Sequence, residues 1–247
     1  MMTPWGDALD PDRVLPEHPR PQLVRDSFLN LNGRWEHAIT SAGAHDVPGR
    51  WDGEIVVPFS PEAPLSGVGR TLQPDEALWY RRTVRLPDGF VRDRVLLHFG
   101  AVDQDCEVWV DGTRVGEHRG GYLPFTLDVT DALAGEVHEL VVRVRDVTDT
   151  SWRSRGKQRL DRGGIWYTPQ SGIWQTVWLE SVPERWVDRL VLTPHLESGE
   201  VEVCIVARGR GELDAEVSIS AAGRTVVVAD VAAGVPTRLR LGSDVRV

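Results

Sequence analysis

The chain has 247 residues and a formal net charge of −9, which disfavours nucleic acid and anionic membrane surfaces as partners. Its two cysteines lie far apart in the sequence, so a disulfide framework is not expected and a reducing compartment is favoured. No run approaches the roughly 18 apolar residues of a membrane span, and no secretory signal pattern opens the chain. Composition therefore predicts a soluble, cytoplasmic protein.

Short strand patterns follow an N-terminal extension, which we place at residues 1–24. They are rich in β-branched and aromatic residues and are bounded by Gly, Pro or Asp. A hairpin is predicted around Asp111-Gly112, because a type I′ turn requires positive φ at both central residues. No segment sustains helical periodicity over about 11 residues, so the chain is predicted to be all-β. The clearest strands are Ala77–Pro87, Arg94–Gly100, Cys106–Gly112, His138–Asp146 and Trp174–Ser181.

Two long connections interrupt these strands, at Pro58–Asp75 and Val147–Thr168. Loops longer than about 12 residues in a compact domain are usually functional or flexible, so both are candidate rim loops. The segment around Gly120-Gly121 is as polar and glycine-rich as the two long connections. We nevertheless interpret it as a tight bend whose Tyr122 and Phe125 pack inward.

A domain boundary is predicted where proline and charge break the strand pattern, at Pro183–Arg185. The strands that follow, in residues 187–247, fit an immunoglobulin-like sandwich. Such a domain normally has about 100 residues and seven strands. We therefore expect an incomplete immunoglobulin-like β-sandwich in this part of the sequence.

Several stretches together resemble glycoside hydrolase family 2, which includes β-galactosidases, β-glucuronidases and β-mannosidases. "LNGRWEHAI", "ALWYRRTVRLP", "HFGAVDQDCEVWVDGTRVGEHRGGYLPFTLDVTDAL" and "YTPQSGIWQTVWLE" match the sugar-binding domain of that family in the same order. The resemblance covers residues 25–183. It implies a galactose-binding-like jelly-roll β-sandwich, a carbohydrate partner, and a following (β/α)₈ barrel that carries catalysis in the family.

The sequence offers no catalytic residue of its own. A retaining glycosidase needs two carboxyl groups about 5–5.5 Å apart. In the family the acid/base glutamate follows an asparagine, whereas Asn30 and Asn32 precede leucine and glycine. No histidine has metal-ligand spacing and no phosphate-cradling glycine loop is present, so neither a metal nor a cofactor is expected. The isolated chain is predicted to be inactive as a hydrolase.

Candidate sugar contacts lie in the second long loop, because sugars stack apolar C–H faces on aromatic rings and need convergent polar groups. In the resembling enzymes an aspartate five residues before the Ser-Gly-Ile turn approaches the sugar. Trp166 stands there in this chain, so the sugar itself cannot be inferred. Ser60, Glu62 and Arg70 of the first long loop are further candidates. The predicted substrate-binding residues are Arg155, Lys157, Gln158, Trp166, Tyr167 and Gln170.

Three functions remain open at this point. The chain is interpreted first as the non-catalytic N-terminal portion of a family 2 retaining exo-glycosidase. The alternatives are a stand-alone carbohydrate-binding module and a purely structural module, which would form homo-oligomers through unpaired strand edges.

Overall fold

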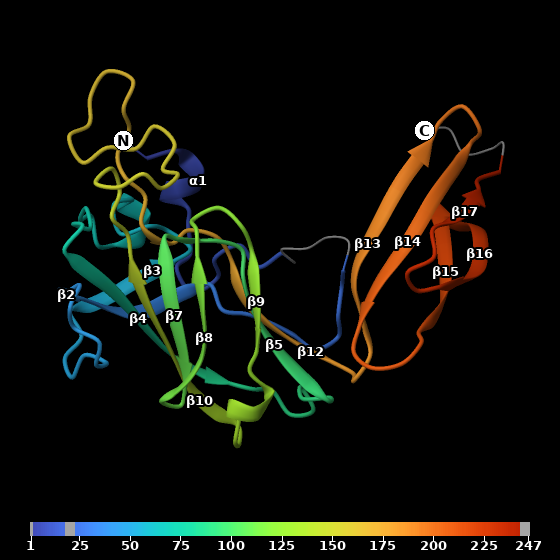
Figure 1. Ribbon diagram of the computed structural model, residues 1–247, viewed down its shortest axis with the longest axis horizontal. Helices are drawn as coiled ribbons and strands as arrows, with labels where there is room; N and C mark the ends of the chain where they lie inside the picture. Colours follow the sequence, from blue (N-terminus) through green and yellow to red (C-terminus); the bar gives the residue numbers. More distant parts are fainter. Residues whose placement is uncertain (1, 18–22, 243–247) are drawn as a thin grey trace. The chain divides into compact units, whose positions relative to one another are not determined.

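The computed structural model describes residues 2–17 and 23–242. The chain forms two compact units, one from residues 1–19 and 25–181 and the other from residues 20–24 and 182–247 (Figure 1). Both consist of β-sheets, which confirms the predicted all-β class. Within the described part of the chain, no helix combines the length and apolar character needed to cross a membrane.

The first unit is a sandwich of two main sheets with a small third one. The largest sheet joins six strands, in spatial order β3 (Gly53–Val57), β2 (Gly33–Ser41), β4 (Glu76–Arg85), β10 (Val137–Arg145), β7 (Asp105–Val110) and β8 (Thr113–Arg119). The second joins β1 (Phe28–Asn30), β12 (Val177–Val182), β5 (Arg94–Phe99) and β9 (Phe125–Asp128), and the third pairs β11 (Gly172–Ile173) with β6 (Val102–Asp103).

Three short helical turns complete this unit. They are α1 (Pro4–Asp7) and the 3₁₀ turns η1 (Pro64–Ser66) and η2 (Thr130–Ala132). The segment predicted as an extension packs onto the sandwich: the side-chain amide of Asn30 donates to the carbonyl of Leu15 over 2.7 Å, and Asp12 pairs with Arg34 at 2.8 Å. Residues 2–17 are therefore part of the first unit rather than a separate tail.

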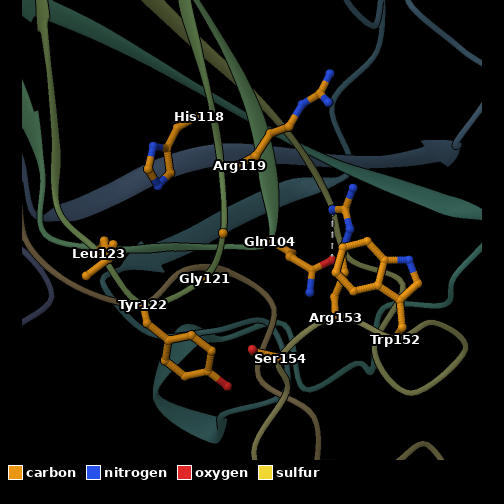
Figure 2. A pocket seen from close by; sticks show the side chains of 10 residues that line it. Gln104, His118, Arg119, Gly121, Tyr122, Leu123, Trp152, Arg153 and Ser154 are labelled. Atoms are coloured by element: carbon orange, nitrogen blue, oxygen red, sulfur yellow. Dashed lines mark hydrogen bonds between the residues drawn. The ribbon is translucent and has the colours of Figure 1, made fainter.

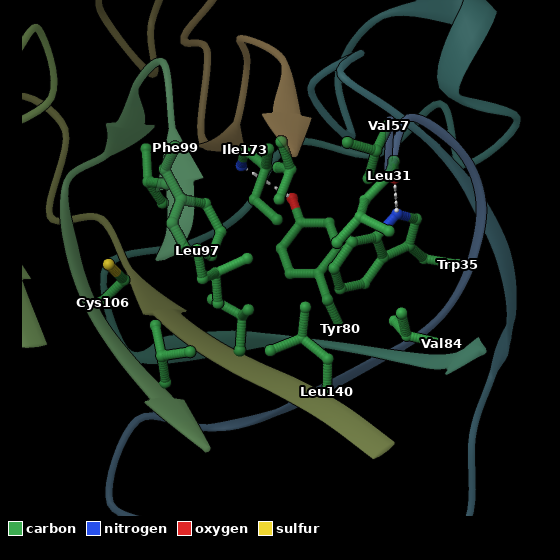
Figure 3. Close-up of a cluster of buried hydrophobic side chains, with 14 of the residues drawn as sticks. Leu31, Trp35, Val57, Tyr80, Val84, Leu97, Phe99, Cys106, Leu140 and Ile173 are labelled. Carbon is green, nitrogen blue, oxygen red and sulfur yellow. Dashed lines mark hydrogen bonds between the residues drawn. The ribbon is translucent and has the colours of Figure 1, made fainter. Parts of the chain in front are cut away.

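A continuous apolar core fills the space between the main sheets (Figure 3). Trp35 of β2 and Tyr80 of β4 meet edge to face with ring centroids 6.3 Å apart. The indole of Trp35 donates to the carbonyl of Leu31 over 2.8 Å, and the Tyr80 hydroxyl accepts from the backbone of Ile173 over 3.1 Å. Both large aromatic residues thus bury their rings without leaving a polar atom unsatisfied.

The predicted hairpin connects β7 to β8. Asp111 and Gly112 have φ values of 48° and 75°, as a type I′ turn requires. The Asp111 carboxylate accepts the backbone N–H of Glu139 over 2.7 Å and contacts the His138 ring at 2.7 Å, which ties the turn to β10.

The second unit is a smaller sandwich. One sheet joins β13 (Trp186–His195), β14 (Glu200–Arg208) and β17 (Thr237–Arg240), and the other pairs β15 (Asp214–Ala221) with β16 (Arg224–Ala232). Its buried core consists of Val203, Ile205, Val231 and Leu239. An apolar hollow of about 480 Å³ lies between side chains of β13, β14 and β15, including Leu190, Val201 and Ile219.

Candidate functional site

The two long loops of the first unit meet and are tied together. The Ser60 hydroxyl donates to Oε1 of Gln170 over 2.6 Å. The Glu62 carboxylate accepts the backbone N–H groups of Ser171 and Leu72, each over 3.1 Å. Ser60 and Glu62, which the sequence offers as sugar contacts, therefore bond one loop to the other. Arg70, the third candidate of that loop, pairs with Glu76.

Three carboxyl groups gather beneath this junction. Ser171 donates its hydroxyl to Asp146 over 3.0 Å, and the side chains of Asp146 and Asp103 are buried. Burial, together with the nearby carboxylates of Asp146 and Glu62, raises the pKa of Asp103 to about 7. Burial likewise raises the pKa of Asp146 and of Glu62, although backbone hydrogen bonds oppose both shifts.

This carboxyl cluster is not arranged for glycoside hydrolysis. A retaining site holds its two carboxyl groups on either side of an accessible bond. Asp103 and Asp146 are only 5% and 2% exposed, and Glu62 accepts two backbone N–H groups from the loops. In residues 2–17 and 23–242, no group of three or more His, Cys, Asp or Glu residues could hold a metal ion. Two of its members, Glu62 and Asp146, hold the loops in place through their hydrogen bonds to Ser171.

Four of the six predicted substrate-binding residues help to build a compact turn within the second loop, in which two short segments run parallel at Gln158 and Tyr167. Gln158 and Tyr167 form an isolated bridge, and the backbone N–H of Tyr167 donates to the carbonyl of Lys157 over 2.8 Å. The Trp166 ring lies under the guanidinium of Arg159, with 4.5 Å between the guanidinium carbon and the ring centroid. Tyr167 is 65% exposed and Lys157 is also exposed, so both side chains are accessible to a ligand.

Arg155 and Gln170, the other two predicted residues, form hydrogen bonds within the loop. Gln158 accepts the backbone N–H of Gln170 over 2.6 Å, so these two glutamines lie side by side. Arg155 donates to the carbonyl of Ser151 over 3.3 Å. The structure thus brings Gln158 and Gln170 together at the base of the turn, whereas Lys157 and Tyr167 project from it.

A separate groove of about 480 Å³ opens beside this loop, where β8, the following bend and the start of the second loop converge (Figure 2). In this view Gln104 and Ser154 lie between the rings of Tyr122 and Trp152. The residues that line the groove are Gln104, His118, Arg119, Gly120, Gly121, Tyr122, Leu123, Trp152, Arg153 and Ser154. None of the six residues predicted from the sequence is among them.

The prediction that Tyr122 packs inward is wrong, whereas the one for Phe125 is confirmed. Phe125 stacks on Phe99 and on His118, with ring centroids 4.8 and 4.2 Å apart. Tyr122 is 46% exposed and meets Trp174 only edge-on at 6.5 Å. The bend turns the Tyr122 ring out of the core, and a pattern of glycines and aromatic residues does not specify which ring turns inward.

Comparison with known proteins matches residues 25–183 to the sugar binding domain of glycosyl hydrolases family 2. A putative β-glucuronidase of Formosa agariphila is 27% identical over 182 residues, which are 73% of this chain and 19% of that protein. The human β-glucuronidase is 29% identical over 61% of this chain and 26% of its own length. The chain thus spans only about a fifth to a quarter of the length of these relatives.

Solved structures share the fold. A β-glucuronidase of Faecalibacterium prausnitzii superimposes with a TM-score of 0.66 at 22% identity over 92% of this chain and 42% of its own. A β-glucuronidase of Ruminococcus gnavus in complex with D-glucuronic acid gives 0.68 at 19% identity over 90% and 41%. The family match covers more than half of the chain and coincides with the jelly-roll sandwich described above, so the chain belongs to glycosyl hydrolases family 2 through its sugar binding domain.

Proposed function

We propose that the chain is the sugar-binding N-terminal part of a family 2 retaining exo-glycosidase, which hydrolyses O-glycosyl bonds. In this proposal the first sandwich supports a catalytic (β/α)₈ barrel, and its loop pair forms one wall of the sugar pocket. Two findings support hydrolysis of glycosidic bonds as the reaction of the whole protein. The chain matches the family model, and its relatives are named β-glucuronidase or β-galactosidase.

The observation that carries the proposal is the fixed junction of the two long loops. Glu62 binds the backbone of both loops, and Ser60 bonds to Gln170. Held in this way, the second loop presents the exposed side chains of Lys157 and Tyr167 at a defined place. An aromatic ring and a cation fixed on a rigid base are suited to orient a sugar for chemistry performed by other groups.

Catalysis itself is assigned to polypeptide outside these 247 residues. In the carboxyl cluster of the first unit, Glu62 and Asp146 are engaged in hydrogen bonds to the loops, and Asp103 is buried. We therefore expect the 247-residue chain to leave glycosides intact, while a longer natural polypeptide that contains it hydrolyses them.

The test is a panel of nitrophenyl β-glycosides, including the glucuronide, galactoside and mannoside, assayed with both proteins. Tyr167→Ala in the longer polypeptide should raise KM by about tenfold, since stacking contributes up to about 1.5 kcal/mol. Val137→Ala, at the opposite end of β10 from the loop, is the control and should leave KM unchanged. Hydrolysis by the 247-residue chain that is lost in Asp103→Asn would refute the proposal, as would a longer polypeptide inactive on every glycoside.

A second candidate function, a carbohydrate-binding module that acts without hydrolysis, is favoured by the open groove between Tyr122 and Trp152. Its affinity for sugars can be measured on the chain alone.

A further inference from the structure

The groove beside the second loop contains a buried side chain whose hydrogen-bonding capacity is only half used. Gln104 is 3% exposed. Its Oε1 accepts from the Arg153 guanidinium over 3.0 Å, which fixes the orientation of the amide. Its Nε2 has no hydrogen-bond partner within the described residues. The nitrogen is not among the buried polar atoms that lack a partner, so it reaches the groove and is free to donate to an acceptor that arrives with a ligand.

Aromatic surface faces the same groove. Trp152 is 94% exposed, the largest exposure among the large hydrophobic side chains described, and Tyr122 is 46% exposed. Leu123 adds further apolar surface at 70% exposure. Two accessible rings around a buried polar group match the ordinary composition of a small-molecule site, which is apolar with few, well-placed polar groups.

The polar floor of the groove is held in place. Arg153 bridges Gln104 and the carboxylate of Asp105. Gly121 is fixed by the Trp174 indole, which donates to its carbonyl over 2.8 Å. An added Cβ at Gly121 would lie 2.3 Å from Oδ1 of Asp103, so the chain passes directly over that carboxyl group. A preorganised floor lowers the entropy cost of binding.

We infer that this groove is a second carbohydrate site, in which a pyranose ring stacks on Trp152 and Tyr122 while one of its oxygens accepts from Nε2 of Gln104. Pyranoses fit because they combine an apolar C–H face with ring and hydroxyl oxygens. The volume of about 480 Å³ lies within the range of about 300–1,000 Å³ for small-molecule sites. The inference deepens the proposed carbohydrate function, but it places this contact on the sandwich itself and away from the turn that carries Tyr167.

The test uses the 247-residue chain and a panel of methyl β-glycosides and β-linked disaccharides at up to about 10 mM, with binding followed by calorimetry and by ¹⁵N–¹H NMR. We expect millimolar binding of at least one sugar. Saturation should shift the side-chain amide signal of Gln104, while that of Gln158, in the turn, stays in place. Gln104→Glu assigns the signal, because this change removes the amide.

Variants then test whether the sugar stacks on Trp152 or whether loss of any exposed tryptophan weakens binding. Trp152→Ala should weaken binding about tenfold, and Trp152→Phe should restore most of it, because the ring surface is what the sugar uses. Trp5→Ala removes a tryptophan that is 82% exposed but does not line the groove, so its affinity should equal that of the unchanged chain.

Two results would overturn the inference: no sugar on the panel binds, or binding is unaffected by Trp152→Ala and weakened by Tyr167→Ala. Neither result bears on the proposed function, which is judged by hydrolysis in the longer polypeptide. Conversely, binding that depends on Trp152 in a protein without hydrolase activity would support the second site and contradict the proposed function.

Discussion

At the scale of single residues, the carboxyl cluster beneath the two loops sets a pH dependence for the first unit. The pKa of Asp103 rises from 3.8 to about 7, mainly because the side chain is buried. Between these values the folded chain holds a proton on Asp103 that the unfolded chain has lost. Folding takes up a proton in this range, so the free energy of unfolding falls as pH rises from about 4 to about 7.

We predict that Asp103→Asn removes most of this dependence. The loss in the unchanged chain should be of the order of 1 kcal/mol per pH unit through the window, since one pKa unit corresponds to about 1.4 kcal/mol. The variant should therefore be more stable than the unchanged chain at about pH 7.5 and similar at about pH 4. Urea unfolding followed by tryptophan fluorescence reports on the first unit, because every tryptophan except Trp186 lies in it.

Asp88→Asn, in an exposed turn, serves as the matched control and should keep the original pH profile. Stability that increases from pH 5 to pH 7.5 in the unchanged chain would contradict the prediction. Glu62 and Asp146 act in the same direction, because burial raises the pKa of both, so some residual slope is expected in Asp103→Asn.

At the scale of elements, one buried carboxylate joins strands of the smaller main sheet. Glu180 of β12 is fully buried, and its Oε2 accepts from Arg25 over 2.8 Å, just before β1. The same oxygen lies 3.5 Å from Nε2 of His98 on β5, and Oε1 accepts from the Trp178 indole over 3.2 Å. The Glu180 carboxylate therefore links β12 to β5 and to the segment just before β1.

Glu180→Gln should destabilise the first unit by about 3–5 kcal/mol, because it removes the charge of a fully buried carboxylate and breaks its ion pair with Arg25. Glu136→Gln is the matched control. It removes a carboxylate that is 71% exposed beside Arg85, and surface pairs contribute only about 0–1 kcal/mol. Equal midpoints of urea unfolding for the two variants would show that Glu180 does not join the strands in this way.

The strands themselves were largely accessible from the sequence. The predicted segment Ala77–Pro87 contains most of β4, and the Asp111-Gly112 turn forms where its preference for positive φ places it. The predicted segment Trp174–Ser181 contains most of β12, but its inner face could not be predicted, because all residues of β12 are buried. A strand covered on both faces loses the alternation of polar and apolar residues by which a sequence reveals the inner face.

The groove could not be predicted for a different reason. Gln104 and Trp152 are far apart in the sequence, and only the pairing of β7 with β10 and the anchoring of Arg153 to Asp105 bring them together. The long loop does reveal itself by its length and its aromatic residues. Some of those residues, such as Gln158, form hydrogen bonds within the loop instead of facing a ligand. The composition of the loop does not predict these hydrogen bonds.

At the scale of the whole molecule, the two units differ in how well their cores are filled. The first unit has a continuous core that includes fully buried Trp35, Tyr80 and Phe99. The second has four buried apolar residues and a hollow of about 480 Å³ between its sheets. Since stability follows buried apolar area and close packing, the second unit should open at a lower free energy than the first.

Hydrogen exchange measured by mass spectrometry tests this difference in stability and whether the units unfold separately. Backbone amides of β13 and β14 should exchange faster than those of β4 and β10. Val203→Ala removes part of the second core and should cost about 2 kcal/mol there, accelerating exchange across the paired strands β13, β14 and β17. Exchange in β4 and β10 should stay unchanged, because Val203 belongs to the other unit. If Val203→Ala accelerates exchange equally in both units, the chain unfolds as one cooperative body, and the division into two independently stable sandwiches is wrong.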